Sequence, residues 1–415
     1  MIKTIQIRVS PECAQKKHLL LKKISNDFNL SKTDIKDINI LKKSIDARQK
    51  IIKINLKIDV YINEKYIEIP EETIYKNVRN SREVLIIGAG PAGLFAGLKL
   101  IEKGIKPIII ERGKKVRNRR RDLASLTKDH IVNPDSNYCF GEGGAGTFSD
   151  GKLYTRSKKR GDVNEILKIL VEHGATPQIK VDAHPHIGTN KLPKIIENIR
   201  ETILNYGGEI LFNSRLSDIV LKNKKVQKII LNNGNEINCS KVILATGHSS
   251  RDIFDLLHEK GIKLEKKSFA IGVRVEHSQE LIDQIQYKCK SRGEFLPPAP
   301  YSISKQIDNR GIYSFCMCPG GIIAPCATSQ EEVVTNGWSP SKRDYPSSNS
   351  GIVVELKSED FKEFSKHDVF AGLEFQKKIE RNAWLMGGKT QKVPAQRLVD
   401  FVNGKISKDI PQTSY

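Results

Sequence analysis

The sequence lacks any apolar run long enough to span a membrane, and its first residues, MIKTIQIRVSPECAQKK, lack the apolar core of a signal peptide. Its seven cysteines are an odd number and do not follow the spacing of a disulfide framework. Hydrophobic residues make up 38% and charged residues 28% of the chain, which excludes a disordered polymer. We therefore expect a cytoplasmic globular protein with reduced thiols, no membrane segment and, over 415 residues, two or three domains.

Acidic residues are scarce relative to basic ones, 48 against 69, which leaves a formal net charge of +21. Basic surfaces bind nucleic acids by releasing counterions. The lysines are scattered, however, and only KKVRNRRR, from Lys114 to Arg121, is a true cluster. We favour solvated lysines on exposed faces over a nucleic-acid partner, and the cluster itself is equally well placed to face the phosphates of a cofactor.

The most informative stretch is VLIIGAGPAGLFAGLKLIEKGIKPIIIER, from Val84 to Arg112. Its four leading apolar residues predict a buried parallel strand. Gly88, Gly90 and Gly93 then form G-x-G-x-x-G, in which the first glycine permits a tight turn, the second admits a pyrophosphate and the third lets the helix pack on the strand. A second apolar strand ends at Glu111, whose carboxylate is placed to accept hydrogen bonds from the ribose hydroxyls of an adenosine. This order of features predicts a dinucleotide site rather than a helix that simply packs on a strand.

A glycine-rich segment, GEGGAGTFSDGKL from Gly141 to Leu153, comes later. It contains a second G-x-G-x-x-G, without an acid-terminated strand, and a G-x-x-x-x-G-K in which Leu153 stands where Ser or Thr must hold magnesium. We favour a loop whose backbone N–H groups approach the pyrophosphate or a flavin ring, with Thr147 and Ser149 as hydroxyl partners, over a plain flexible loop. A later apolar strand ends in Ala245-Thr246-Gly247 and is expected to bring its backbone near the same dinucleotide.

These pieces together resemble the glutathione-reductase-like superfamily of FAD-binding proteins. Longer segments are similar to those of a largely uncharacterised bacterial family of FAD-dependent dehydrogenases, over essentially the whole chain: SNYCFGEGGAGTFSDGKL, PHIGTNKL, ATGHSSRD, FAIGVRVEH, YSFCMCPGG, NGWS and PAQRLVDF. The resemblance implies a flavoprotein oxidoreductase that binds FAD, and it implies no known substrate. We expect a small-molecule substrate and take NAD(P)H as the candidate electron donor. One departure is the lack of a late strand ending in Gly-Asp before Tyr415, which predicts a chain without the C-terminal end of the family.

The expected fold is α/β, with an FAD-binding Rossmann-like domain, an inserted substrate domain built on a mixed β-sheet, and a small ferredoxin-like α/β domain at the N-terminus. The expected boundaries are 1–65 for the N-terminal domain, 66–82 for a linker, 83–265 for the first part of the FAD domain, 266–371 for the substrate domain and 372–415 for a segment returning to the FAD domain. Within the FAD domain we expect one strand over 208–219.

The motifs and the resemblance together nominate the residues that bind the cofactor. They are Gly88, Gly90, Pro91, Ala92, Gly93, Glu111, Arg112, Gly143, Gly144, Ala145, Gly146, Thr147, Leu216, Ala245, Thr246 and Gly247. No metal is expected, because His184 and His186 lack acidic or cysteine partners nearby in the sequence.

Catalytic candidates are fewer. His248 follows the Ala-Thr-Gly strand end and ranks first as a general acid. Cys316 and Cys318 lie two apart on a predicted strand and so share one face, which allows a redox dithiol, although buried small apolar residues are the favoured interpretation.

Two other functions remain open. One is an NAD(P)-dependent dehydrogenase without flavin, because Glu111 serves the adenosine of either cofactor. The other is a flavoprotein acting on tRNA, which the basic charge suggests and in which Arg119, Arg120 and Arg121 would contact the RNA.

Overall fold

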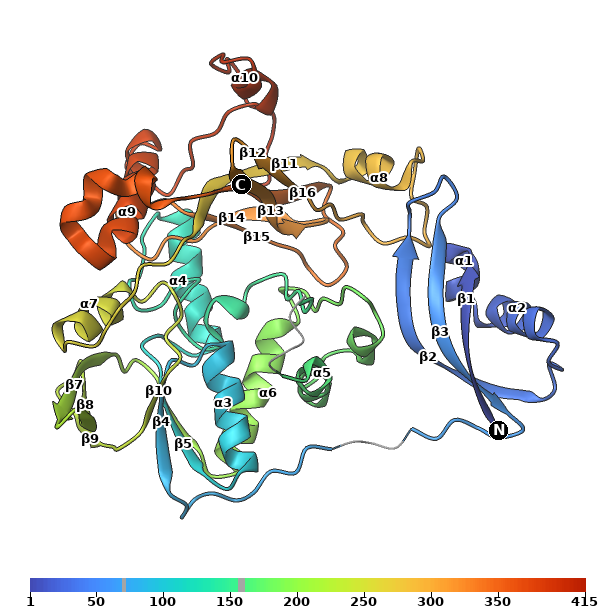
Figure 1. Cartoon of the computed structure of the whole chain (residues 1–415), viewed down its shortest axis with the longest axis horizontal. Helices are drawn as coiled ribbons and strands as arrows, with labels where there is room; N and C mark the ends of the chain where they lie inside the picture. Colours follow the sequence, from blue (N-terminus) through green and yellow to red (C-terminus); the bar gives the residue numbers. More distant parts are fainter. Residues whose placement is uncertain (69–71, 156–160) are drawn as a thin grey trace.

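The chain forms three units in the computed structural model, which describes residues 1–68, 72–155 and 161–415 (Figure 1). A small antiparallel sheet lies at one side, a parallel sheet with its helices forms a second unit, and another antiparallel sheet lies across the top of the view. Within the described ranges, no helix is both long and apolar enough to cross a bilayer.

The N-terminal unit is a three-stranded antiparallel sheet of order β1-β3-β2. Its elements are β1 (Ile2–Val9), α1 (Pro11–Gln15), α2 (Lys17–Phe28), β2 (Ile35–Asp46) and β3 (Lys53–Ile62). Alternate residues of β3, such as Leu56 and Ile58, are buried together with Leu20 and Ile24 of α2. The prediction of a ferredoxin-like domain is wrong, because both helices precede β2 and no helix follows β3 before β4 in the part of the chain that the structure describes. The predicted linker over 66–82 carries no helix or strand in its described residues, and 69–71 lie outside them.

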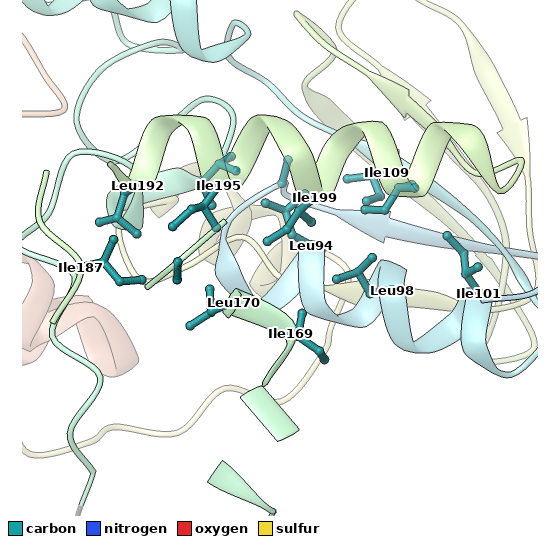
Figure 2. Packing of buried hydrophobic residues seen from close by; sticks show 14 of the residues in the cluster. Leu94, Leu98, Ile101, Ile109, Ile169, Leu170, Ile187, Leu192, Ile195 and Ile199 are labelled. Carbon is teal, nitrogen blue, oxygen red and sulfur yellow. The ribbon is translucent and has the colours of Figure 1, made fainter. Parts of the chain in front are cut away.

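The second unit is built on a parallel sheet of order β10-β4-β5-β6. Its first elements are β4 (Glu83–Ile87), α3 (Pro91–Glu102), β5 (Lys106–Ile110), α4 (Val116–Lys128), α5 (Val163–Glu172), α6 (Leu192–Asn205) and β6 (Glu209–Leu211). One face of the sheet, through Ile86 and Ile109, packs on α3 and α6. Figure 2 shows this layer, with Leu94 and Leu98 of α3 lying opposite Ile199 of α6.

The other face of the parallel sheet carries a second layer. It consists of the antiparallel strands β7 (Leu216–Lys222), β8 (Lys225–Leu231) and β9 (Glu236–Asn238), followed by β10 (Val242–Leu244) and α7 (Arg251–Glu259). Leu85, Ile87, Ile108 and Ile110 are buried against this layer, so both faces of the sheet are covered, as the unbroken apolar strands predicted.

The single strand predicted over 208–219 is wrong. The chain divides there into β6 of the parallel sheet and β7 of the second layer. Asn213 lies between them with a positive φ of 53°. The backbone N–H groups of Asn213 and Ser214 donate to the carbonyls of Gly113 and Glu111, so contacts distant in sequence turn the chain out of the sheet.

The third unit centres on an antiparallel sheet of order β11-β16-β13-β12. Its elements are β11 (Ala270–Ser278), α8 (Gln279–Tyr287), β12 (Ser304–Ile307), β13 (Arg310–Cys318), β14 (Ile322–Pro325), β15 (Thr335–Trp338), β16 (Ser347–Glu355), the 3-10 segment η3 (Ser358–Phe370), α9 (Ala371–Met386) and α10 (Leu398–Val402). A mixed sheet was expected, but every neighbouring pair of strands in this sheet runs antiparallel.

The third unit contacts both of the others. Ile282 and Tyr287 of α8 and Met317 of β13 are buried in the same hydrophobic cluster as the N-terminal sheet. At the other end, Arg251 of α7 forms ion pairs with Glu332 and with Glu380 of α9, the latter at 2.8 Å. Through Glu380, α9 thus contacts α7 of the second unit.

Candidate cofactor and active site

The main cavity lies where the parallel sheet changes direction. The chain proceeds from β4 outward to β5 and β6, and then returns to place β10 on the other side of β4. Loops that leave the carboxyl ends of neighbouring strands separate at such a point and leave a crevice in which α/β proteins bind ligands. Here residues after β4, β5 and β10 line a cavity of about 360 Å³.

The three motif positions after β4 differ in whether and why the structure requires glycine there. Gly88 has a positive φ of 104°, and a Cβ there would lie 2.4 Å from the carbonyl oxygen of Ala245. A Cβ at Gly93 would lie 1.9 Å from the carbonyl oxygen of Gly88, so this glycine lets α3 touch the turn. Gly90 has extended backbone, with φ −70° and ψ −178°. A Cβ there would meet no protein atom closer than the Cα of Gly144, at 3.9 Å, so neither backbone conformation nor packing requires glycine at Gly90.

Glu111, at the end of β5, is 4% exposed and lines the cavity. Its Oε2 accepts a hydrogen bond from the Ala89 N–H at 2.7 Å. Its Oε1 accepts from the N–H groups of Gly113 and Gly141 at 2.8 and 2.9 Å. A carboxylate has about four acceptor positions, so one remains for a ligand hydroxyl. The side chain thus joins the first glycine turn to the glycine-rich loop as well as facing the cavity.

The glycine-rich loop is held from beneath by Arg119 of α4, which is 0% exposed. Its guanidinium donates to the carbonyls of Asn137, Tyr138, Glu142 and Gly144 at 2.7–2.9 Å. Burial lowers the pKa of Arg119 to about 10, so the side chain stays charged at neutral pH. Arg119 is therefore unavailable to RNA, and the part of the tRNA interpretation that used it is wrong.

Thr147 and Ser149 do not present free hydroxyls to the cavity. The Thr147 hydroxyl donates to the Glu142 carbonyl at 2.6 Å and accepts from Arg119 at 3.1 Å. The Ser149 hydroxyl donates to the Gly146 carbonyl at 2.8 Å and accepts from the Gly151 N–H at 3.1 Å. Both hydroxyls stabilise the loop itself, which corrects their expected role as cofactor partners.

The opposite wall comes from the turn between β6 and β7, which the prediction of one continuous strand concealed. Ser214, Arg215 and Leu216 line the cavity. The Nε of Arg215 is buried 3.9 Å from Asp135 Oδ1, an ion-pair distance, and donates no hydrogen bond in the described structure, so its N–H can be donated to a ligand. Arg112 lies between the two walls, donates to Asp135 and Asp252, and has its guanidinium carbon 4.3 Å from the ring centre of Phe140.

The cavity brings together most of the residues nominated from the sequence. Its wall contains Gly88, Gly90, Pro91, Ala92, Glu111, Arg112, Gly144, Ala145, Leu216, Ala245, Thr246, Gly247 and His248. Gly93, Gly143, Gly146 and Thr147 stand behind the wall rather than in it. Sequence reasoning did not nominate the other lining residues, Ile87, Ile110, Cys139, Phe140, Ser214, Arg215, Leu244, Ser249, Ser250 and Ile253. Of these, Cys139, Phe140, Ser249 and Ser250 lie within the segments that resemble the family.

The catalytic candidates occupy two different places. His248 lines the cavity, and its Nδ1 lies 3.4 Å from the Ser249 hydroxyl. Cys139 also lines the cavity, and a hydrogen bond with the Cys326 thiol lowers the pKa of Cys139 to about 7. Cys316 and Cys318 lie outside this wall, on β13, with the Lys152 ammonium beside both sulfurs.

The parallel sheet, the glycine turn and the cavity are those of a dinucleotide-binding domain, and family comparisons specify it further. Residues 82–282 match a model described as pyridine nucleotide-disulphide oxidoreductase, and residues 268–415 match the FAD-dependent protein C-terminal domain. Residues 1–61 match a domain of unknown function. An uncharacterised protein of Clostridium beijerinckii is 40% identical over 408 residues, covering 94% of this chain and 76% of the relative. The chain belongs to the same family as this relative, a family of FAD-dependent proteins.

Other similarities are weaker. A dual trans-enoyl reductase/FAD-dependent monooxygenase of Aspergillus terreus is 41% identical over 58 residues, which are 14% of this chain and 8% of that protein. Solved structures of CtdE in complex with FAD and of tetracycline destructase Tet(51) are 15% and 11% identical, with TM-scores of 0.32 and 0.33. The matches cover 76% and 72% of this chain, and 70% and 62% of those chains.

The residues of the cavity fit FAD. The glycine at position 90 offers room for phosphates, and Glu111 offers a free acceptor position for a ribose hydroxyl. The Nε of Arg215 makes no hydrogen bond in the described structure and offers an additional donor. The cofactor of this family is FAD, and these groups are the ones in this chain that suit its ADP portion.

Proposed function

We propose that the protein is a dehydrogenase-type FAD-dependent oxidoreductase that acts on a small-molecule substrate, with NAD(P)H as electron donor. The flavin supplies hydride or electron transfer, and the chain supplies binding, orientation and exclusion of water. In this proposal the N-terminus of α3 and Gly90 face the pyrophosphate, and Glu111 accepts from the ribose. His248 is the proposed general acid, because it is the histidine in the wall of the cavity.

Gly90 carries the proposal. Glycine at a position with ordinary extended backbone and empty space around its Cβ has no explanation within the protein. A phosphate group that lies against the backbone explains it, because a side chain would occupy the same space.

Gly90→Val tests the proposal. We expect the variant to keep its far-ultraviolet circular dichroism spectrum and to bind FAD at least about tenfold more weakly, a change of about 1.4 kcal/mol. Flavin absorbance of the purified protein and mass spectrometry of the extracted cofactor are the measurements. Gly161→Val is the matched control, because a Cβ at Gly161 meets no described atom within 4 Å and Gly161 does not line the cavity.

FAD retention by Gly90→Val at the wild-type stoichiometry would contradict the proposal and leave the glycine motif a purely structural feature. Extraction of NAD(P) without flavin from the wild type would instead support the alternative dehydrogenase, which the family models do not favour.

A further inference from the structure

A second cluster of reactive groups lies outside the cavity, where β13 ends. Cys316 has a positive φ of 48°. The pairing of β13 with β16 is regular up to Phe315 and resumes at Cys318 after a bulge. The bulge interrupts the alternation of side chains that a regular strand would have. Both cysteine sulfurs nevertheless lie near one lysine, while Met317 between them is buried in the core shared with the N-terminal sheet.

The lysine is Lys152, from the glycine-rich loop. Its Nζ lies 3.3 Å from the Cys318 sulfur and 3.9 Å from the Cys316 sulfur. Lys152 also forms a 3.0 Å ion pair with Asp150, a carboxylate that Arg343 shares at 2.9 Å. Two cations therefore divide the charge of one buried acid, and the surroundings of the sulfurs keep a positive excess.

One further cation, Arg274, faces Cys316 and adds to this excess. Arg274 of β11 donates to the Cys316 carbonyl at 3.3 Å, and Asn336 of β15 lies 3.9 Å from the sulfur. A hydrogen bond from the Cys318 thiol, followed by the charges of Lys152 and Arg274, lowers the pKa of Cys316 to about 5. The same hydrogen bond and burial raise the pKa of Cys318.

The two sulfurs differ in access. Cys316 is half-buried, and the Lys152 side chain beside it is 32% exposed. Cys318 is 0% exposed. In thiol–disulfide exchange the attacking sulfur must be a reachable thiolate, whereas the second sulfur only has to reach the first. Here Cys316 is the accessible thiol and Cys318 is the buried one.

We propose that Cys316 and Cys318 form a redox-active dithiol that reduces low-molecular-weight disulfides, with Cys316 as the attacking thiolate and Lys152 as its positioning cation. Cys316 attacks one sulfur of the disulfide, forms a mixed disulfide and releases the other half as a thiolate. Cys318 then loses its proton to solvent and attacks the Cys316 sulfur, which releases the second half. One external disulfide is reduced to two thiols, and one Cys316–Cys318 disulfide is formed. This exchange requires no flavin.

Trapping with oxidised glutathione tests the exchange. The wild-type protein is expected to end with a Cys316–Cys318 disulfide, and Cys318→Ser is expected to accumulate glutathione on Cys316, both identified by peptide mass spectrometry. Cys326→Ser is the matched control, because Cys326 lies on the same polypeptide segment but its thiol hydrogen-bonds to the Cys139 thiol. The variant should exchange with oxidised glutathione as the wild type does. An unmodified Cys316 in Cys318→Ser, or glutathione on Cys139 instead, would overturn the proposal.

The pH dependence of alkylation tests the role of Lys152. With iodoacetamide, the wild-type Cys316 should react with a midpoint below pH 7, whereas Cys239, whose pKa burial raises, serves as the slow internal standard. Lys152→Met should raise the Cys316 midpoint by about one pH unit, which corresponds to a tenfold loss of thiolate at low pH. Lys305→Met, at an exposed lysine of the same sheet, should not change it. An unchanged midpoint in Lys152→Met would show that the lysine does not position the thiolate.

Discussion

Arg119 shows how one residue determines the shape of the site. A fully buried guanidinium has no water to solvate it, so its donors must find protein acceptors. They do so on four carbonyls from both ends of the segment 137–144. The backbone that forms one wall of the cavity is thus held in place by Arg119, whose own side chain does not line the cavity. Within the basic cluster of the sequence, Arg119 has a structural role, whereas most of its neighbours are exposed.

Arg119→Met should lower the free energy of unfolding by about 3 kcal/mol or more, because several buried acceptors lose their donor and each costs about 1–3 kcal/mol. FAD retention should fall with it, because Gly144 and Ala145 lose their support. Urea denaturation and flavin absorbance measure the two effects. Arg120→Met, at the exposed neighbour on the same helix, should stay within about 0.5 kcal/mol of wild type. Equal stability of the two variants would contradict this account of the loop.

At the scale of elements, the β4–α3–β5 unit was predictable because short-range rules determine it. Its strands are unbroken apolar runs, and its glycines have fixed spacing. The division between β6 and β7 was not predictable, because it depends on hydrogen bonds from Asn213 and Ser214 to residues about a hundred positions earlier in the chain. Arg215 lines the cavity because it lies in the turn between β6 and β7. No sequence pattern predicted that turn, so none predicted the position of Arg215.

The close packing of α3 on the turn after β4 predicts how the protein responds to added side chains at Gly93 and Gly97. Gly93→Ala should destabilise the protein by about 3 kcal/mol or more, because the new Cβ would lie 1.9 Å from a backbone oxygen that cannot move alone. Gly97→Ala places a Cβ 3.1 and 3.2 Å from the flexible ends of Ile109 and Ile203 and gains helix propensity, so it should stay within about 1 kcal/mol. Thermal unfolding of the two variants measures the difference. A Gly97→Ala variant as unstable as Gly93→Ala would show that the side chains of Ile109 and Ile203 cannot move aside, and would contradict the expected difference.

At the scale of the molecule, residues from two distant parts of the sequence share one core. Ile58 of β3 and Leu20 of α2 are buried in a cluster with Ile282, Tyr287 and Met317 of the third unit. Sequence patterns placed the two sheets in separate domains, and periodicity contains no information about which apolar faces meet. The order of the units along the chain was predictable, whereas their common core was not.

Ile282→Ala should therefore lower the stability of the N-terminal sheet and the third unit together, by about 2–5 kcal/mol. Hydrogen exchange of the β3 and β16 amides should speed up to the same extent, while the β4 and β5 amides keep their protection. Leu98→Ala, in the α3–α6 layer, should show the reverse pattern. Faster exchange confined to α8 after Ile282→Ala would show that the two sheets unfold independently.

The position of Met317 has a consequence for how the protein tolerates change. Its side chain is buried among apolar residues of the N-terminal sheet. Because Cys316 and Cys318 are its neighbours in the chain, the packing of Met317 also holds the two sulfurs in place. A substitution in the core of the N-terminal sheet, outside the cofactor cavity, would therefore make the positions of both thiols less well fixed. Sulfur reactivity would then report the integrity of a region that takes no part in the chemistry.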